Sequence, residues 1–302
     1  NALKIQADYF SEKREGIFLE RASLPLYIGV STKPYVNVGK MKNHGFDTSL
    51  EYNQRVGQVR LSGKANFTYA HNTIIDNDQP DWKYPYLNRR GQMLWQQYGL
   101  VAAGLFESQA DIDSWPTQTF GEVKPGDIKY IDINGDGKID TNDEKPIGWA
   151  AVPEIVYGFG LSAAWKGLDC SVFFQGAGHV TLQQSGSAIQ AFSARNMMES
   201  GVYEDIYYNH WSEDNPNPNA KYPRLSIGSN KNNFRNSTFW QKDMSYLRLK
   251  TVEIGYNFPS KWIDPIHISG LRIYLSGVNL LTFSKFKLWD PEVLEGQGAN
   301  YP

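Results

Sequence analysis

The sequence contains little cysteine and no long apolar run. Cys170 is the single cysteine among 302 residues, which excludes a disulfide within the chain. No segment approaches the roughly 18 consecutive apolar residues that a membrane-spanning helix needs. The start at Asn1 also lacks the charged and then apolar stretch of a signal peptide. If the chain enters a membrane, we therefore expect it to do so through β-strands.

The net charge is close to zero, and familiar catalytic motifs are missing from the sequence. The formal net charge is −2, so nothing indicates a polyanion partner such as nucleic acid. The five histidines are scattered without an H-E-x-x-H pairing, and the sequence has no G-x-S-x-G elbow. We expect that the chain is not an enzyme.

Apolar and polar residues instead alternate with a period of two over long stretches of the sequence. In residues 154–166 the odd positions from Ile155 to Trp165 are apolar, whereas the even positions include Glu154 and Ser162. Successive side chains of a strand point to opposite faces, so such runs predict strands with one apolar face. They predict seven strands, at residues 2–10, 44–55, 57–70, 154–166, 168–177, 245–258 and 269–280.

Alternation alone does not separate a soluble β-sandwich from an outer-membrane barrel. Most of these runs exceed the average soluble strand of about five or six residues and suit a tilted bilayer crossing of roughly 9–11. Connections after residues 55, 166 and 258 are short, and those after residues 10, 70, 177 and 280 are long. Barrels with short periplasmic turns and long extracellular loops show this asymmetry. We therefore predict an all-β fold, an antiparallel transmembrane β-barrel segment with long extracellular loops at 71–153 and 178–244.

The expected barrel is incomplete, and its two faces differ. Bacterial single-chain barrels have an even number of strands, so we expect a fragment with strands before it and at least one after it. The side chains predicted to face lipid are Phe159, Leu161, Val172, Phe174, Ile254 and Ile273. Those predicted to face the lumen or the rims are Glu51, Arg60, Lys64, Glu154, Lys166, Asp169, Glu253 and Arg272.

Residues 132–143 carry the pattern of a calcium loop. Oxygen-bearing side chains occupy positions 1, 3, 5, 9 and 12, and Gly137 stands at position 6, where the loop turns sharply. Four carboxylates this close together repel one another unless a cation neutralises them. Position 12 is Asp143 rather than the usual Glu, and residues 127–131 are predicted to be extended rather than helical. The loop therefore lacks the helix pair of an EF-hand, and we predict a structural site rather than a calcium switch. The expected ligands are Asp132, Asn134, Asp136, the Lys138 carbonyl, Asp140 (directly or through water) and Asp143.

Short motifs along the whole chain resemble those of one family. They include Gly126-Asp-Ile-Lys-Tyr130, Lys221-Tyr-Pro-Arg224, Tyr246-Leu-Arg-Leu-Lys250 and Asp290-Pro-Glu292. In this order they resemble the C-terminal barrel region of SusC/RagA-type TonB-dependent outer-membrane transporters. Residues 1–302 would then be the C-terminal portion of such a barrel, without the plug domain and the last strand.

The resemblance implies active import of oligosaccharides or peptides through a plugged barrel of roughly 22 strands in the outer membrane of a Gram-negative bacterium. It also implies a SusD-like surface lipoprotein as a lid, and TonB, contacted through the missing N-terminal part, as the source of energy. Aromatic rings suit both sugar faces and a protein lid. We expect Trp82, Trp95, Trp115 and Trp211 to contact substrate or lid.

One alternative stays open, a secreted, calcium-stabilised, β-rich protein that binds or degrades carbohydrate. It accounts for the calcium loop and the tryptophans. It does not account for the alternation of short and long connections or for the charged strand faces. Within 178–244 we also predict a short helix at 188–199.

Overall fold

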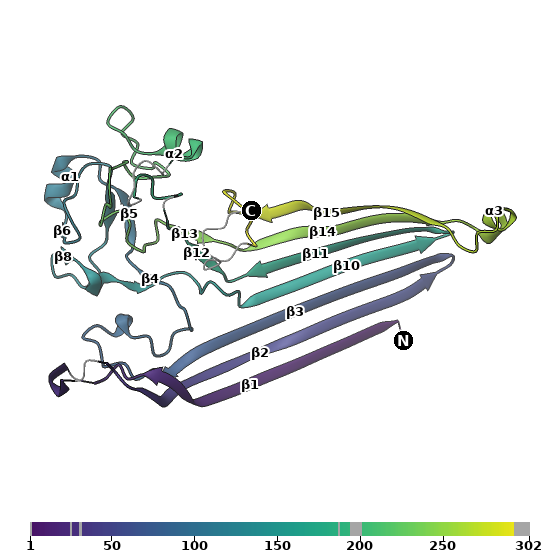
Figure 1. The fold of residues 1–302 in the computed structure, drawn as a ribbon, viewed down its shortest axis with the longest axis horizontal. Coiled ribbons are helices and arrows are strands. Elements are labelled where there is room, and N and C mark those ends of the chain that lie inside the picture. Colours follow the sequence, from purple (N-terminus) through teal and green to yellow (C-terminus); the bar gives the residue numbers. More distant parts are fainter. Residues whose placement is uncertain (1, 25, 30–31, 187, 194–200, 293–302) are drawn as a thin grey trace.

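Seven long antiparallel strands form one continuous sheet and follow one another in chain order (Figure 1). The computed structural model describes residues 2–24, 26–29, 32–186, 188–193 and 201–292. Each strand pairs with the next through its backbone, and all seven predicted strands are present. They are β1 (Leu3–Glu20), β2 (Tyr35–Val56), β3 (Val59–Asp76), β10 (Ile155–Trp165), β11 (Leu168–Gly178), β14 (Tyr246–Asn257) and β15 (Arg272–Ser284).

The two ends of the sheet carry different connections. At one end, on the right in Figure 1, tight turns join β2 to β3 and β10 to β11, and a segment with short helices joins β14 to β15. At the other end, the described residues of 77–154 and 179–245 fold together into a body that we call the head. The described residues between β1 and β2 also lie at the head end. The long connections therefore gather on one side of the sheet, as predicted.

The head is built from short elements. Its strands pair in four two-stranded ribbons, β4 with β9, β5 with β7, β6 with β8 and β12 with β13. Residues 188–193 form turns instead of the predicted helix, and the rest of that prediction lies outside the described residues. No helix of the described residues has the length and apolar character to cross a membrane. The remaining elements are η1 (Leu26–Ile28), η2 (Pro85–Leu87), β4 (Tyr98–Gly99), β5 (Ala102–Leu105), α1 (Gln109–Ser114), β6 (Thr117–Gln118), β7 (Ile128–Tyr130), β8 (Lys138–Ile139), η3 (Thr141–Asp143), β9 (Lys145–Pro146), β12 (Thr181–Gln183), α2 (Glu204–Asn209), β13 (Gln241–Asp243), α3 (Ser260–Ile263) and η5 (Asp264–Ile266).

The pairing register places the predicted apolar residues on one face of the sheet. Phe159 pairs with Phe174 on one side and with Ala65 on the other, and all six residues predicted to face lipid share this face. Their side chains are open to the surroundings, with Leu161 63% and Ile254 51% exposed. A soluble sandwich needs a second sheet against this face, and the described residues outside the large sheet form only two-stranded ribbons. The apolar face is therefore available to lipid.

The first two strands are longer than predicted. β1 continues to Glu20 instead of ending at residue 10, and β2 begins at Tyr35. The connection between them, 21–34, is accordingly much shorter than predicted. Beyond residue 10, polar side chains such as Glu12 and Lys13 stand on both faces, so the alternation that supports the prediction is missing. Backbone pairing continues there without an apolar face.

Buried apolar side chains gather in the head rather than on the sheet. Leu100, Ile128 and Tyr130 of the first connection pack in one cluster with Tyr222 and Trp240 of the second. All five side chains are almost completely buried. The two long connections therefore share one core, and the head is a folded body rather than a pair of independent loops.

A buried carboxylate joins the two connections at the edge of this core. Asp127 is fully buried and accepts hydrogen bonds from the backbone N–H of Lys124 (2.8 Å) and from Arg224 Nη2 (3.0 Å). Its other oxygen accepts from the side chains of Asn233 (2.8 Å) and Asn230 (3.1 Å). Four donors surround this one buried carboxylate, which thereby holds the second connection against the first.

Replacing Leu161 with Arg tests the assignment of the sheet faces. A charge near the bilayer midplane costs about 2–4 kcal/mol on the lipid side of a barrel strand, so we expect Leu161→Arg to lower the yield and the melting temperature of the full-length protein in outer membranes. Ser162→Arg, one residue later on the polar face, is the matched control and should assemble normally. Equal assembly of the two variants would contradict the assignment.

Replacing Asp127 with Ala tests the connection between the two halves of the head. The change leaves Arg224 without its buried partner, and breaking such a pair costs about 3–5 kcal/mol. We expect faster hydrogen exchange across the head and unchanged exchange in the seven long strands. Glu122→Ala is the control, because that side chain is 81% exposed. Unchanged protection of the head in Asp127→Ala would show that the pair is dispensable.

Candidate functional site

The polar face of the sheet carries paired charges. Arg272 Nη2 lies 2.5 Å from Asp169 Oδ1 and 2.6 Å from Glu253 Oε1, across three neighbouring strands. Lys64 lies 3.9 Å from Glu51 on the adjoining part of the same face. The pairing register puts these residues opposite the apolar face, as predicted for a lumen. The charges neutralise one another, so this part of the face offers few free groups to a ligand.

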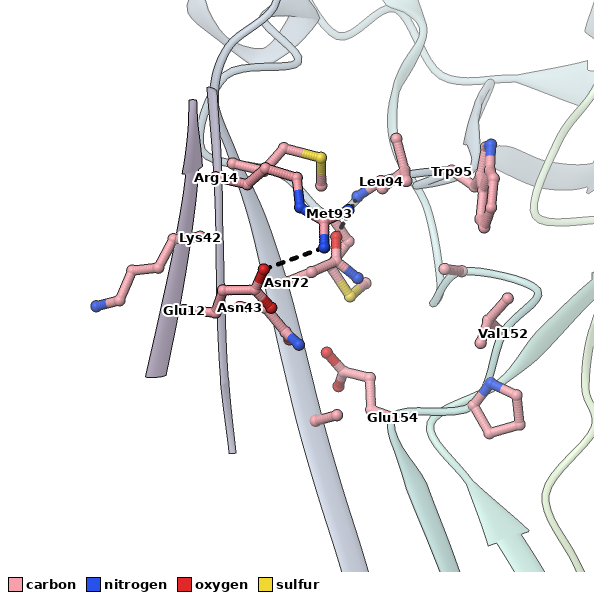
Figure 2. Close-up of a pocket in the computed structure, with 14 residues that line it drawn as sticks. Glu12, Arg14, Lys42, Asn43, Asn72, Met93, Leu94, Trp95, Val152 and Glu154 are labelled. Atoms are coloured by element: carbon pink, nitrogen blue, oxygen red, sulfur yellow. Dashed lines mark hydrogen bonds and ion pairs between the residues drawn. The ribbon is translucent and has the colours of Figure 1, made fainter. Parts of the chain in front are cut away.

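A pocket lies where the head meets the polar face of β1, β2 and β3 (Figure 2). Its volume is about 330 Å³, which is at the lower end of small-molecule sites. On the sheet side, Glu12 and Asn43 face the hollow, and Trp95 and Val152 of the first long connection stand across from them. We call it the junction pocket. It is lined by Glu12, Arg14, Met41, Lys42, Asn43, Ala70, Asn72, Met93, Leu94, Trp95, Ala150, Val152, Pro153 and Glu154.

One hydrogen bond places the head segment over the sheet at this pocket. The backbone N–H of Leu94 donates to Asn72 Oδ1 at 2.7 Å (Figure 2). The next polar residue, Gln96, is buried and donates to the carbonyls of Ile147 and Gly148 at 3.0 Å each. Residues 93–96 are thus attached both to β3 and to the end of the same connection, so the pocket has fixed walls.

A carboxylate and two imidazoles form a cluster beside the junction pocket that the sequence does not reveal. Glu154 is nearly buried, and its two oxygens lie 2.5 Å from His71 Nδ1 and 3.0 Å from His179 Nδ1. The indole of Trp149 stacks on His179 with 3.9 Å between ring centroids. His71 lies within β3, Glu154 directly precedes β10, and His179 directly follows β11. No spacing in the sequence marks them, because they meet only through strand pairing.

Two of the four singled-out tryptophans are exposed. Trp82 is 52% and Trp95 66% exposed, both in the first long connection. Trp95 lines the junction pocket, whereas Trp82 does not. Both rings can reach a partner or a ligand.

The other two tryptophans pack into the head. Trp115 donates from its indole nitrogen to the Tyr130 carbonyl at 2.7 Å, and the Lys129 ammonium sits 3.9 Å above its ring. Trp211 is only 5% exposed and covers Gly126, whose φ is +84°. A Cβ at Gly126 would lie 2.1 Å from the Trp211 ring, so glycine is required there for both its φ and its size. In this structure both indoles contribute to the core of the head.

The predicted calcium loop is closed by its own side chains. Asp132 accepts from the backbone N–H groups of Gly135 (2.7 Å) and Gly137 (2.8 Å). Asp143, fully buried, accepts from Ile133 (2.8 Å) and Asp140 (2.8 Å), and so joins the two ends of the loop. In the described residues no group of three or more His, Cys, Asp or Glu side chains has an arrangement that could hold a metal ion, and the loop carboxylates are no exception. Calcium binding therefore requires the carboxylates to turn toward a common centre, and it stays a prediction.

The surroundings of this loop are electrostatically negative. The Tyr86 hydroxyl donates to the Asn142 carbonyl at 2.7 Å. Burial raises the pKa of this hydroxyl, and the nearby charges of Asp143, Asp132 and Asp136 raise it further. The smaller part of this pKa shift comes from the loop carboxylates, which together make a negatively charged region that favours a cation.

Comparison with known proteins shows similarity to TonB-dependent receptors. It matches no protein-family model. Two TonB-dependent receptors of Formosa agariphila are each 28% identical to it, over 100% and 98% of this chain and 29% of each receptor. The TonB-dependent receptor SusC of Bacteroides thetaiotaomicron is 23% identical over 94% of this chain and 27% of SusC. The chain thus spans less than a third of the length of these relatives.

Solved structures agree on the fold. The RagAB peptide importer in its open-open state matches with a TM-score of 0.70 at 23% identity, over 96% of this chain and 30% of that one. A second RagAB structure, described as a peptide transporter, matches with a TM-score of 0.69 at 24% identity, over 96% of this chain and 31% of that one. Receptors of this kind are not enzymes, in agreement with the expectation from the sequence. The chain is similar to TonB-dependent receptors, SusC among them, over nearly its whole length, and its seven long strands share their fold with part of the RagAB structures.

Proposed function

We propose that the protein containing this chain imports a nutrient across the outer membrane, with energy supplied through TonB. TonB-dependent receptors such as SusC are outer-membrane proteins. The observation that supports import most directly is the arrangement of the sheet, with an exposed apolar face on one side and a charged face on the other. Such a wall separates lipid from an aqueous lumen.

The position of the head supports an entrance on the same side. Residues 93–95 and 150–154 lie over the polar face at the end of β1, β2 and β3. In a closed barrel this placement puts the head above the lumen, on the side of the long connections. We therefore propose that the head lies outside the cell and shapes the mouth of the barrel.

The proposed cargo is a peptide or an oligosaccharide, and the proposed partner is a SusD-like surface lipoprotein. The RagAB structures are described as a peptide importer, with an open-open and a closed-closed state. Two such states fit a barrel with a movable lid. The exposed rings of Trp82 and Trp95 are suited to contact with the lid or with the cargo.

Deleting the gene and removing TonB tests the import function. We expect the deletion strain to lose uptake of one class of peptides or oligosaccharides, and a strain without TonB to lose the same uptake while the receptor still assembles. Restoring the gene should restore uptake. Uptake that continues at the same rate without TonB would contradict the proposal.

We further propose that residues 132–143 bind one calcium ion that stiffens the head. An oxygen that accepts one N–H bond keeps a second lone pair, so Asp132 and Asp143 can hold the loop and bind an ion together. Asn134, Asp136, the Lys138 carbonyl and Asp140 would complete the oxygen ligands that calcium prefers. By ordering the loop before a lid closes, calcium would spare the entropy that closure otherwise costs.

The double variant Asp132→Ala/Asp136→Ala tests this calcium site. We expect it to abolish a calcium-dependent rise in the melting temperature of the intact receptor, and to weaken lid binding and uptake while the barrel assembles normally. Asp132→Asn separates the two roles of that side chain, because it keeps an oxygen for the Gly137 N–H but removes the charge. A melting temperature that does not respond to calcium or to a chelator in the natural protein would rule out the site.

A further inference from the structure

The junction pocket has an apolar floor on an otherwise charged face. Met93 and Ala150 are 6% and 4% exposed and form its base, together with Ala70 of β3 and Met41 of β2. Neither the lipid contact nor the core of the head uses this apolar surface. A concave apolar surface with a few polar groups at its edge is the usual form of a ligand site.

The conformation of Trp95 is a second, independent observation. The Gln96 N–H donates to the Met93 carbonyl at 3.1 Å and closes a turn over residues 93–96. Trp95, the third residue of that turn, has φ +59°, a conformation that normally selects glycine or asparagine. Holding a bulky residue there stores backbone strain. The turn nevertheless presents a 66% exposed indole at the pocket, across from Asn43 and Glu12 (Figure 2).

Polar groups also line the pocket, among them the buried carboxylate of Glu154, which already pairs with His71 and His179. Arg14 Nη2 lies 3.0 Å from Glu12 Oε1, so the two charges compensate each other. Asn43 and Asn72 bring side-chain amides, which donate and accept hydrogen bonds as a peptide group does. The site therefore offers both apolar contact and amide-like hydrogen bonding.

We propose that the junction pocket holds an apolar side chain of an imported peptide, an inference that rests on the import function proposed above. A sugar ring carries hydroxyl groups around its whole edge, and these would lose their hydrogen bonds against a floor of methionine and alanine. An apolar side chain has no such groups. Its flanking peptide units would meet Asn43 and the compensated Glu12–Arg14 pair. Met41 and Met93 can adapt to side chains of different shape.

Binding of defined peptides to the intact receptor tests this inference. The probes are pentapeptides Ala-Ala-Xaa-Ala-Ala in which Xaa is Ala, Leu, Phe or Asp, with maltohexaose as the oligosaccharide probe. We expect the Leu and Phe peptides to bind roughly ten-fold or more tightly than the Ala peptide, since a few methylene groups in an apolar pocket supply that much. The Asp peptide and maltohexaose should bind no better than the Ala peptide.

Two variants locate the preference in the junction pocket. Val152→Trp fills the pocket from a half-exposed position, and Trp95→Ala removes the indole and relieves its strain. Each should abolish most of the preference for Leu and Phe. Tyr208→Ala removes a similarly exposed ring (67%) from α2, outside the pocket, and should keep the preference.

The outcomes separate this inference from the import function. If uptake depends on TonB but Val152→Trp and Trp95→Ala keep the natural preference, the pocket assignment is wrong and import stands. If maltohexaose binds in the pocket and peptides do not, the peptide assignment is overturned. If uptake does not depend on TonB, the import function fails, whatever the variants do.

Discussion

The alternation of side chains across a strand is the constraint on which the structure depends. Because the period is two, one pairing register decides at once which residues of all seven strands meet lipid and which meet the lumen. A slip of one residue would turn Leu161 inward and Ser162 outward. The cross-strand match of Phe159 with Phe174 and of Leu161 with Val172 shows that the register is consistent between neighbours. The two-sided wall is therefore a consequence of pairing and needs no buried core of its own.

The head meets a different requirement, because its strands are too short to be stable by pairing alone. Its ribbons have only two strands each, and isolated pairs of that kind are marginal in water. Stability comes instead from the apolar cluster around Trp240 and Tyr130, and from the hydrogen bonds that converge on Asp127. A buried charge surrounded by donors is directional, whereas apolar packing is not. Asp127 thereby sets how the second connection sits on the first.

A feature of this structure could be predicted from the sequence only where residues close together along the chain form a recognisable pattern. Strands such as β10 and β14 were predictable because one face is apolar over their whole length. The outer parts of β1 and β2 were not, since water bathes both faces of that pair and Glu12 and Lys13 carry no alternation. The cluster of His71, Glu154 and His179 was equally hidden, because its members are brought together by strand pairing. The calcium-loop pattern is local and therefore visible, yet whether its carboxylates turn toward an ion depends on the ion itself.

The part of β1 beyond residue 10, which the sequence pattern does not predict, also contributes to the junction pocket. Glu12 and Arg14 stand on the polar face, like the charged residues of the wall, but beyond the apolar band of the sheet. There no lipid contacts the strands, so neither face needs apolar side chains. Polar side chains on the lumen face can then line a pocket. Asn72 then uses its oxygen to hold the Leu94 N–H, and the head segment that follows bears the strained Trp95. The pocket thus lies where the strands still pair but no longer need an apolar face toward lipid.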